Sequence, residues 1–157
     1  NKCQGKGCIF EDDNDDTVNR FLEKAKEADG FVFGTPVYFA HPSGQILSFL
    51  NRVFYSSAVG ELYPVFAGKP GAAIASARRG GTTAAVDVIQ KYFGIASMPI
   101  VTSTYWNMVH GMTPDEVRKD LEGMQTMRNI GRNMAWMRRG RPGKAARSEQ
   151  SMIYVTG

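Results

Sequence analysis

The hydrophobic residues of this chain follow two alternating patterns. Short apolar runs occur at 30–35, 71–76 and 99–103, and each one leads into a stretch rich in Gly, Ser, Thr or aromatic residues. Between these runs, apolar residues recur three and four positions apart, as they do on one face of a helix. Strands that alternate with helices predict a parallel sheet, because right-handed crossovers connect such strands.

Four segments carry the helical pattern, and we expect helices at 16–28, 43–54, 82–93 and 113–139. The first helix follows a run of acidic residues, which are favourable near the positive end of a helix dipole. Thr113, Pro114 and Glu116 start the last helix as an N-cap, a first-turn proline and a capping-box partner. A final apolar run at 151–156 has two interpretations, a β-like edge or a segment without regular structure.

The composition is that of a single globular domain, with 157 residues of which 43% are hydrophobic and 22% charged. No apolar run approaches the roughly 18 residues of a membrane span, so we expect no membrane partner. Five basic residues lie at 138–147 without an acidic one, and removing them from the net charge of +4 leaves −1. We therefore divide the chain into a domain at 1–139 and a basic tail at 140–157. We interpret the tail as solvated, because no recognition-helix signature supports nucleic-acid binding.

The start of the sequence is unusual, because Asn1 stands where a natural chain has Met. Three strands also make a thin sheet, since about five are usual. We therefore expect an N-terminal segment with further strands to precede this sequence. The only two cysteines are Cys3 and Cys8, and no signal-peptide pattern stands at the front. Both observations favour a reducing, cytoplasmic location.

Three loops, at 34–44, 77–83 and 103–111, each follow one of the predicted strands. In a parallel sheet such loops lie at the same edge and form a crevice where ligands bind. The backbone N–H groups at the starts of the following helices suit an anionic or electron-rich group. The aromatic residues of these loops suit a flat ring, which favours a nucleotide-like or flavin-like cofactor. For Trp106 taken alone, a core or interface anchor is an equal interpretation.

The loop sequences also carry a family resemblance. The segments are Gly34-Thr35-Pro36-Val37-Tyr38-Phe39, Ser43-Gly44-Gln45, 49–53, 77–83, 105–111 and Glu122-Gly123. In combination they resemble the NADPH-dependent FMN reductase group of flavodoxin-like proteins, over roughly 1–139. The resemblance implies an α/β fold of the flavodoxin-like three-layer α/β/α type with a parallel sheet, FMN as cofactor and NAD(P)H as co-substrate. The family's first strand and its Gly-Ser-x-Arg-type phosphate loop have no counterpart in this sequence.

The resemblance also implies which residues bind the flavin. Backbone groups near 37–39 face the N5, O4 and N3 edge of the ring, and residues 78–82 approach its pyrimidine side. Donors at that edge stabilise the negative charge of a reduced flavin. The implied cofactor-binding residues are Thr35, Pro36, Val37, Tyr38, Phe39, Ser43, Ala77, Arg78, Arg79, Gly80, Gly81, Thr82 and Trp106. Arg78 and Arg79 have two further interpretations, contacts to the NADPH phosphates and solvated loop residues.

No side-chain acid or base is obligatory when the flavin carries the hydride. The candidates for such a role are His41, Tyr105 and His110. His41 and His110 are the only histidines in the sequence, and each lies in one of the three loops. Either one can donate to an oxygen of a bound quinone or to the flavin, or it can simply bond to backbone. No Cys, Asp or Glu stands at metal-ligand spacing to either histidine.

Cys3 and Cys8 are spaced C-x4-C. In some members of the resembled family, this region is the second half of a C-x2-C-x2-C-x4–7-C motif that binds a [4Fe–4S] cluster. Two cysteines cannot hold such a cluster, which takes four thiolates. Three interpretations therefore remain: structural or free thiols, a cluster in the intact protein, and a redox disulfide.

Two functions from different classes follow from these observations. The first is an FMN-dependent NAD(P)H oxidoreductase that passes a hydride to a quinone, a flavin or another small acceptor. The second is a flavodoxin-like electron-transfer protein with an iron–sulfur cluster in the intact form. A non-catalytic protein with the same crevice is a third hypothesis. The methionine-rich face of the last helix has two interpretations, core packing and dimer packing. The resemblance implies assembly as a homodimer or homotetramer, and Trp106 and the last helix are where we expect the partner to bind.

Overall fold

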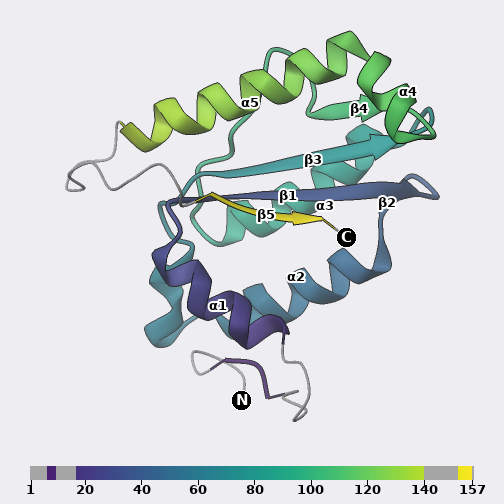
Figure 1. Ribbon diagram of the computed structural model, residues 1–157. Helices are drawn as coiled ribbons and strands as arrows, with labels where there is room; N and C mark the ends of the chain where they lie inside the picture. The colour runs from purple at the N-terminus through teal and green to yellow at the C-terminus, as the bar shows by residue number, and fades with distance from the viewer. Residues whose placement is uncertain (1–6, 10–16, 140–151, 157) are drawn as a thin grey trace.

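The computed structural model describes residues 7–9, 17–139 and 152–156. Helices cover both faces of a central sheet, with α1, α2 and α3 on one side and α5 on the other (Figure 1). The elements are α1 (Thr17–Glu27), β1 (Gly30–Tyr38), β2 (His41–Pro42), α2 (Gly44–Ser56), the 3-10 helix η1 (Gly60–Val65), β3 (Gly71–Ala77), α3 (Thr82–Ile95), β4 (Met108–His110), α4 (Pro114–Lys119), α5 (Leu121–Arg139) and β5 (Met152–Thr156). The fold is therefore the expected three-layer α/β arrangement.

The sheet is mixed, which corrects the expectation of a wholly parallel one. β1 lies between β3 and β5 and is parallel to both, while β3 is also parallel to β4. β2 runs antiparallel to the end of β1, because the chain turns back after Tyr38 and pairs His41 with it. The predicted parallel order holds for the other strand pairs.

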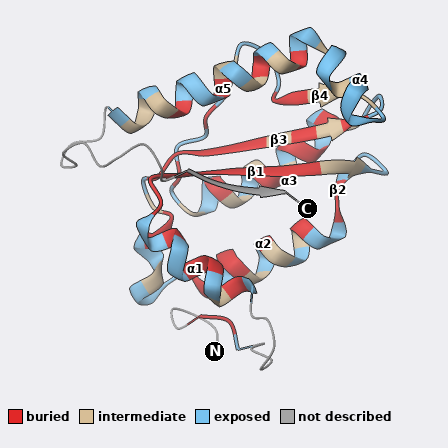
Figure 2. Cartoon of the chain, in the orientation of Figure 1, coloured by how far each residue is buried: buried red, intermediate tan, exposed pale blue. Residues whose placement is uncertain are grey.

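β1 sends its side chains alternately into two apolar layers. Phe31 and Phe33 are fully buried against α1, α2 and α3, whereas Val32 packs with Ile130 and Met134 of α5. The strand is buried over most of its length (Figure 2). Burying each phenylalanine contributes about 1.5–3 kcal/mol to folding. This burial holds β1 at the centre of the sheet, and its carboxyl end carries the loop at 39–43.

The third predicted strand, 99–103, was placed too early in the sequence. Only a single bridge, from Ile100 to Gly71, forms in that run, and the strand itself is β4. The physical reason lies in α5, whose side chains hold the intervening loop. Asn133 Nδ2 donates to the Thr102 carbonyl at 2.7 Å, and Ser103 Oγ donates to the backbone of α5 at 2.8 Å.

The long last helix is also divided, because Asp120 separates α4 from α5. The Asp120 carboxylate accepts a hydrogen bond from the backbone N–H of Gly123 at 2.9 Å, as an N-cap residue does. The β-like interpretation of the final apolar run is confirmed for 152–156, since β5 pairs with β1 from Gly30 to Gly34. Residues 140–151 of the predicted basic tail lie outside the described ranges.

Candidate functional site

Three loops meet at the carboxyl edge of the sheet. β1 and β3 run side by side to Pro36 and Ser76, and β3 and β4 continue together to Ala77 and His110. The N–H of Gly111 then donates to the Ala77 carbonyl at 3.0 Å. The exits of β1, β3 and β4 are therefore neighbours, as the crevice hypothesis required.

The turn after β1 has an uncommon backbone. Phe39 and Ala40 have φ angles of 52° and 58°, and they connect Tyr38 to His41 in a tight hairpin. Two successive residues with positive φ are typical of a type I′ turn, in which Asn-Gly is preferred. A side chain in this conformation costs about 1–2 kcal/mol per residue. Phe39 is nevertheless fully exposed, so burial of its ring does not repay that cost within this chain.

Gly81 brings the second loop against this turn. Its φ is +96°, and a Cβ added there would lie 2.7 Å from Ala40 Cα and 3.0 Å from Val37 Cγ1. Only glycine fits both the backbone angle and the close contact. Gly81 is also the N-cap of α3 and supplies no side-chain hydrogen bond to it. Gly81 therefore does not cap the first N–H groups of α3. These groups lie at the end of the helix that borders the crevice.

Thr35 and Ser43 are buried and shape the first loop from within. The N–H of Ser43 donates to Thr35 Oγ1 at 3.0 Å, and Ser43 Oγ accepts from the N–H of Ile46 at 3.3 Å. The helix was expected to begin at Ser43, and the structure shows this residue to be the N-cap of α2. Both hydroxyls have partners inside the loop, so their observed role is to fix its course.

A mostly apolar cavity of about 280 Å³ opens on the α5 side of the strand ends. Two of the predicted cofactor-binding residues, Thr35 and Pro36, line it together with Ser76 and Val109. Its walls come from β1, β3 and β4. The cavity therefore joins the edge of the crevice to the sheet face below it.

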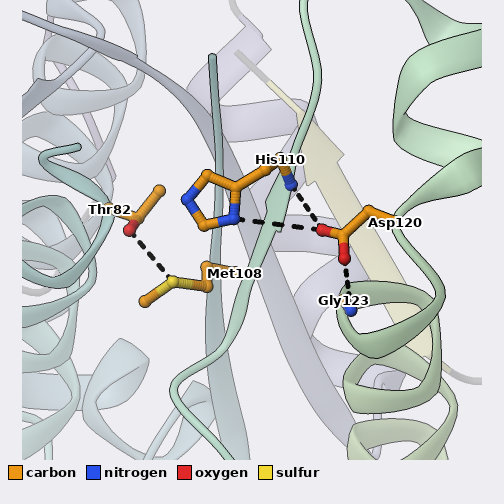
Figure 3. Close-up of polar contacts among 5 residues, drawn as sticks. All are labelled: Thr82, Met108, His110, Asp120 and Gly123. Atoms are coloured by element: carbon orange, nitrogen blue, oxygen red, sulfur yellow. Dashed lines mark hydrogen bonds and ion pairs between the residues drawn. The ribbon is translucent and has the colours of Figure 1, made fainter. Parts of the chain in front are cut away.

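Figure 3 shows the third wall of the crevice, where β4 meets α3 and α5. Thr82 Oγ1 donates to Met108 Sδ at 3.1 Å, which links the start of α3 to β4. The backbone N–H of His110 donates to Asp120 Oδ2 at 2.7 Å. The imidazole Nδ1 of His110 lies 3.9 Å from the same oxygen, with the histidine side chain 41% exposed. The carboxylate thus contacts both the backbone and the ring side of His110.

The surroundings of Asp120 favour its charged form. The pKa of the carboxyl is held below its ordinary value, chiefly by the hydrogen bond from the N–H of Gly123. The N–H and the charge of His110 lower this pKa further, while partial burial of the carboxyl opposes the shift. The sequence analysis missed Asp120 because it lay inside a helix predicted as continuous. The signal available in the sequence was an Asp three residues before a glycine.

Tyr105 and Trp106 do not lie at the strand exit where the sequence analysis placed them. They precede β4 and stack edge-to-face with ring centroids 4.7 Å apart. They line a separate cavity of about 340 Å³ with Val86 and Gln90 of α3. The loop predicted at 103–111 is therefore a loop that leads into β4, followed by β4 itself. The loop that leaves the carboxyl end of this strand begins after His110.

The remaining predicted residues lie at the surface of the crevice loops. Tyr38, His41, Arg78, Arg79 and Gly80 are exposed. Val37 is half-buried against the second loop, and Ala77 is buried at the end of β3. No further contact of these side chains assigns them a role, so their part in cofactor binding stays a prediction.

Cys8 is buried next to α1 and α2. Asn19 holds its backbone N–H and carbonyl at 2.8 and 3.0 Å, and Arg52 Nε lies 3.2 Å from its Sγ. Cys3 lies outside the described residues. Within the described ranges, no group of three or more His, Cys, Asp or Glu is arranged to hold a metal ion. The same ranges contain no helix with the length and apolar character needed to cross a membrane.

Comparison with known proteins identifies the family. The family model of NADPH-dependent FMN reductases matches residues 2–113. The chain therefore belongs to this family of flavin oxidoreductases, and the family supports FMN and NAD(P)H as its cofactor and co-substrate.

Its relatives include two iron–sulfur flavoproteins of Methanocaldococcus jannaschii. One is 33% identical over 86% of this chain and 70% of its own length, and the other is 29% identical over 78% and 64%. An iron–sulfur flavoprotein of Archaeoglobus fulgidus is 29% identical over 84% of this chain and 69% of its own. This chain thus spans about two thirds of the length of these relatives.

Solved structures with a similar fold support the flavodoxin-like architecture. An NADPH-quinone reductase from P. pentosaceus has a TM-score of 0.52 at 16% identity, over 72% of this chain and 74% of that one. The Flv1 flavodiiron core from Synechocystis sp. has a TM-score of 0.53 at 15% identity, over 78% of this chain and 26% of that one. At these identities the similarity concerns the fold alone.

Proposed function

We propose that this protein is an FMN-dependent NAD(P)H oxidoreductase that passes a hydride to a quinone, a flavin or another small acceptor. The observation that carries the proposal is the strained turn at Phe39 and Ala40, which presents an exposed aromatic ring beside Gly81 and the start of α3. Strain of this kind persists where surrounding structure fixes it, and it clusters at ligand clamps. Membership of the FMN reductase family supports the cofactor.

The residues of the crevice fit a flavin ring in three respects. Tyr38 and Phe39 offer exposed aromatic surface to a flat ring. The turn and the start of α3 offer backbone N–H donors to its electron-rich edge. The crowded contact between Gly81 and Ala40 holds these two sets of donors in a fixed relation. When bound, FMN supplies the hydride transfer, and the chain supplies orientation and hydrogen bonds.

Anaerobic reduction tests this function directly. The purified chain is mixed with FMN, freed of excess cofactor and then treated with NADPH while the flavin absorbance near 450 nm is recorded. The proposal predicts retained flavin that is bleached by NADPH and restored by 1,4-benzoquinone. A chain that takes up no FMN, or bound FMN that NADPH leaves oxidised, would contradict it.

A second candidate is an electron-transfer protein with an iron–sulfur cluster in the intact form. The names of the relatives favour it, as does Cys8, because the neighbouring Arg52 guanidinium suits a thiolate. Iron and acid-labile sulfide in the protein purified without oxygen would support this candidate, and their absence would contradict it.

We also propose that the chain assembles as a homodimer or homotetramer. Large apolar side chains are exposed on its surface, notably Trp106 and Trp136. Light scattering coupled to gel filtration measures the mass of the assembly, and a monomer at micromolar concentration would contradict this proposal.

A further inference from the structure

His110 differs from the other polar residues of the crevice because the Asp120 carboxylate contacts both its backbone N–H and its imidazole ring. It is the last residue of β4 and pairs with Ala77 at the strand exit. Asp120 accepts from its backbone N–H with one oxygen, and from the N–H of Gly123 with the other. One carboxylate therefore ties the end of β4 to the first turn of α5 (Figure 3). A side chain at Gly123 would collide with that carboxylate, so the sequence leaves room for it.

The ring of His110 is placed to exchange a proton with a ligand in the crevice. Its Nδ1 faces Asp120 Oδ2 at 3.9 Å, and its side chain is 41% exposed. The second ring nitrogen, Nε2, points away from Asp120 (Figure 3). Thr82 of α3 lies on the side of the ring away from Asp120 (Figure 3). Ala77, the strand partner of His110, directly precedes the exposed Arg78 and Arg79 in the sequence. Within the described crevice, Asp120 is thus the carboxylate in direct contact with His110.

We infer that His110 is the proton donor to the two-electron acceptor that the enzyme reduces and that Asp120 is its positioning residue. This inference rests on the proposed oxidoreductase function and deepens it. An acceptor of one electron alone needs no proton donor at this position. A quinone does, because its reduction consumes two electrons and two protons.

The reaction balances with His110 in this role. A hydride, which FMN would supply when bound, would bring two electrons and one proton to the quinone. The resulting hydroquinone anion takes the second proton from Nε2 of the imidazolium, where an N–H bond breaks and an O–H bond forms. Neutral imidazole then regains a proton from water. Asp120 balances the positive charge of the imidazolium before the transfer, and its hydrogen bond to the backbone keeps the ring in place.

The first experiment tests the Asp120 contact and needs no cofactor. Backbone amide signals of the full chain are followed by NMR in an acid titration. The amides of His110 and Gly123 are expected to shift with one common midpoint, below the usual range of an Asp carboxyl, and to lose this transition in Asp120→Asn. Independent midpoints for the two amides would overturn the positioning role of Asp120, whether or not the protein binds FMN.

The second experiment tests proton donation. FMN-loaded protein is reduced with dithionite, so that the result does not depend on NADPH, and is then mixed rapidly with 1,4-benzoquinone or ferricyanide. General acids contribute about 10²- to 10⁴-fold to a rate, so His110→Gln is expected to slow the reaction with the quinone about 100-fold at pH 7. Ferricyanide accepts an electron without a proton, and its rate is expected to stay within about twofold.

Two further variants complete this test. Asp120→Asn keeps an acceptor for Gly123 but loses the charge, and we expect about a tenfold loss with the quinone, whereas Asp115→Asn on exposed α4 leaves the rate unchanged. Equal slowing with both acceptors, or no slowing with either, overturns the inference. If NADPH fails to reduce the flavin while dithionite reduces it, the proposed function is contradicted. The comparison of the two acceptors still tests the role of His110, because it does not use NADPH.

Discussion

The two loops that touch across the crevice adopt the same uncommon backbone region with different residues. The second loop uses Gly81, for which a positive φ has no steric cost, whereas the first uses Phe39 and Ala40, for which it does. Where shape alone is needed, glycine is sufficient. We therefore propose that a ligand, rather than the fold, uses the strained and exposed side chain of Phe39.

The largest expected effect comes from removing the glycine. Gly81→Ala places a Cβ 2.7 Å from Ala40 Cα at a φ of +96°. The left-handed backbone costs about 1–2 kcal/mol and overpacking about 1–3 kcal/mol, so the free energy of unfolding should fall by about 2–5 kcal/mol in urea titrations. Gly80→Ala is the matched control, because nothing lies within 4 Å of its added Cβ. If both variants were equally stable, the proposed contact between the loops would be wrong.

The first loop should respond in the opposite direction. Phe39→Gly and Ala40→Gly both relieve a positive φ, and each should raise the free energy of unfolding by about 0.5–1 kcal/mol. Only Phe39→Gly removes aromatic surface from the crevice, so it alone should weaken FMN binding, by about tenfold. Fluorescence titration of FMN measures this difference. Equal FMN affinity in the two variants would mean that the strain serves no ligand.

The third wall depends on hydrogen bonds rather than on backbone strain. Asp120→Ala removes an N-cap and should cost about 1 kcal/mol near neutral pH. The pKa of this carboxyl is lowered in the folded chain. Between the folded and the unfolded pKa of this carboxyl, the unfolded state binds more protons than the folded state. The stabilisation by Asp120 is therefore fully present above about pH 4, the pKa of an unfolded Asp. It is lost as the pH falls through the folded value.

Urea titrations at several pH values check this dependence. The stability difference between the wild type and Asp120→Ala should shrink at acid pH. Asp115→Ala, which removes an exposed pair with Arg118, should change stability by at most about 0.5 kcal/mol. A difference between the wild type and Asp120→Ala that grows on acidification would contradict the assignment of the lowered pKa.

The sequence predicted those parts of the fold that depend on local pattern. The apolar run after Gly30 and the start of a helix at Ser43 need only neighbouring residues, and both were placed correctly. The course of 99–107 could not be predicted in this way, because hydrogen bonds from Asn129 and Asn133 of α5 decide it. Those partners are about 25 to 31 residues away in the chain, and no local signal records them.

The same division applies to the candidate site. The loops at 34–44 and 77–83 were predicted to meet, because strand exits share one edge of a parallel sheet. The positive φ of Phe39 was not evident, since Phe-Ala lacks the Asn-Gly signature of such a turn. Asp120 was missed because its partners, His110 and Gly123, come together only in three dimensions.

The most direct measurement is a map of the backbone amides that respond to FMN. The ¹H–¹⁵N NMR spectrum of the full chain is recorded while FMN is added, so that even weak binding is located by residue. Binding at the crevice predicts the largest shifts at 37–40 and 78–83. Shifts centred instead on Trp106 and α3, or no shifts at millimolar FMN, would contradict the assignment of the crevice as the flavin site.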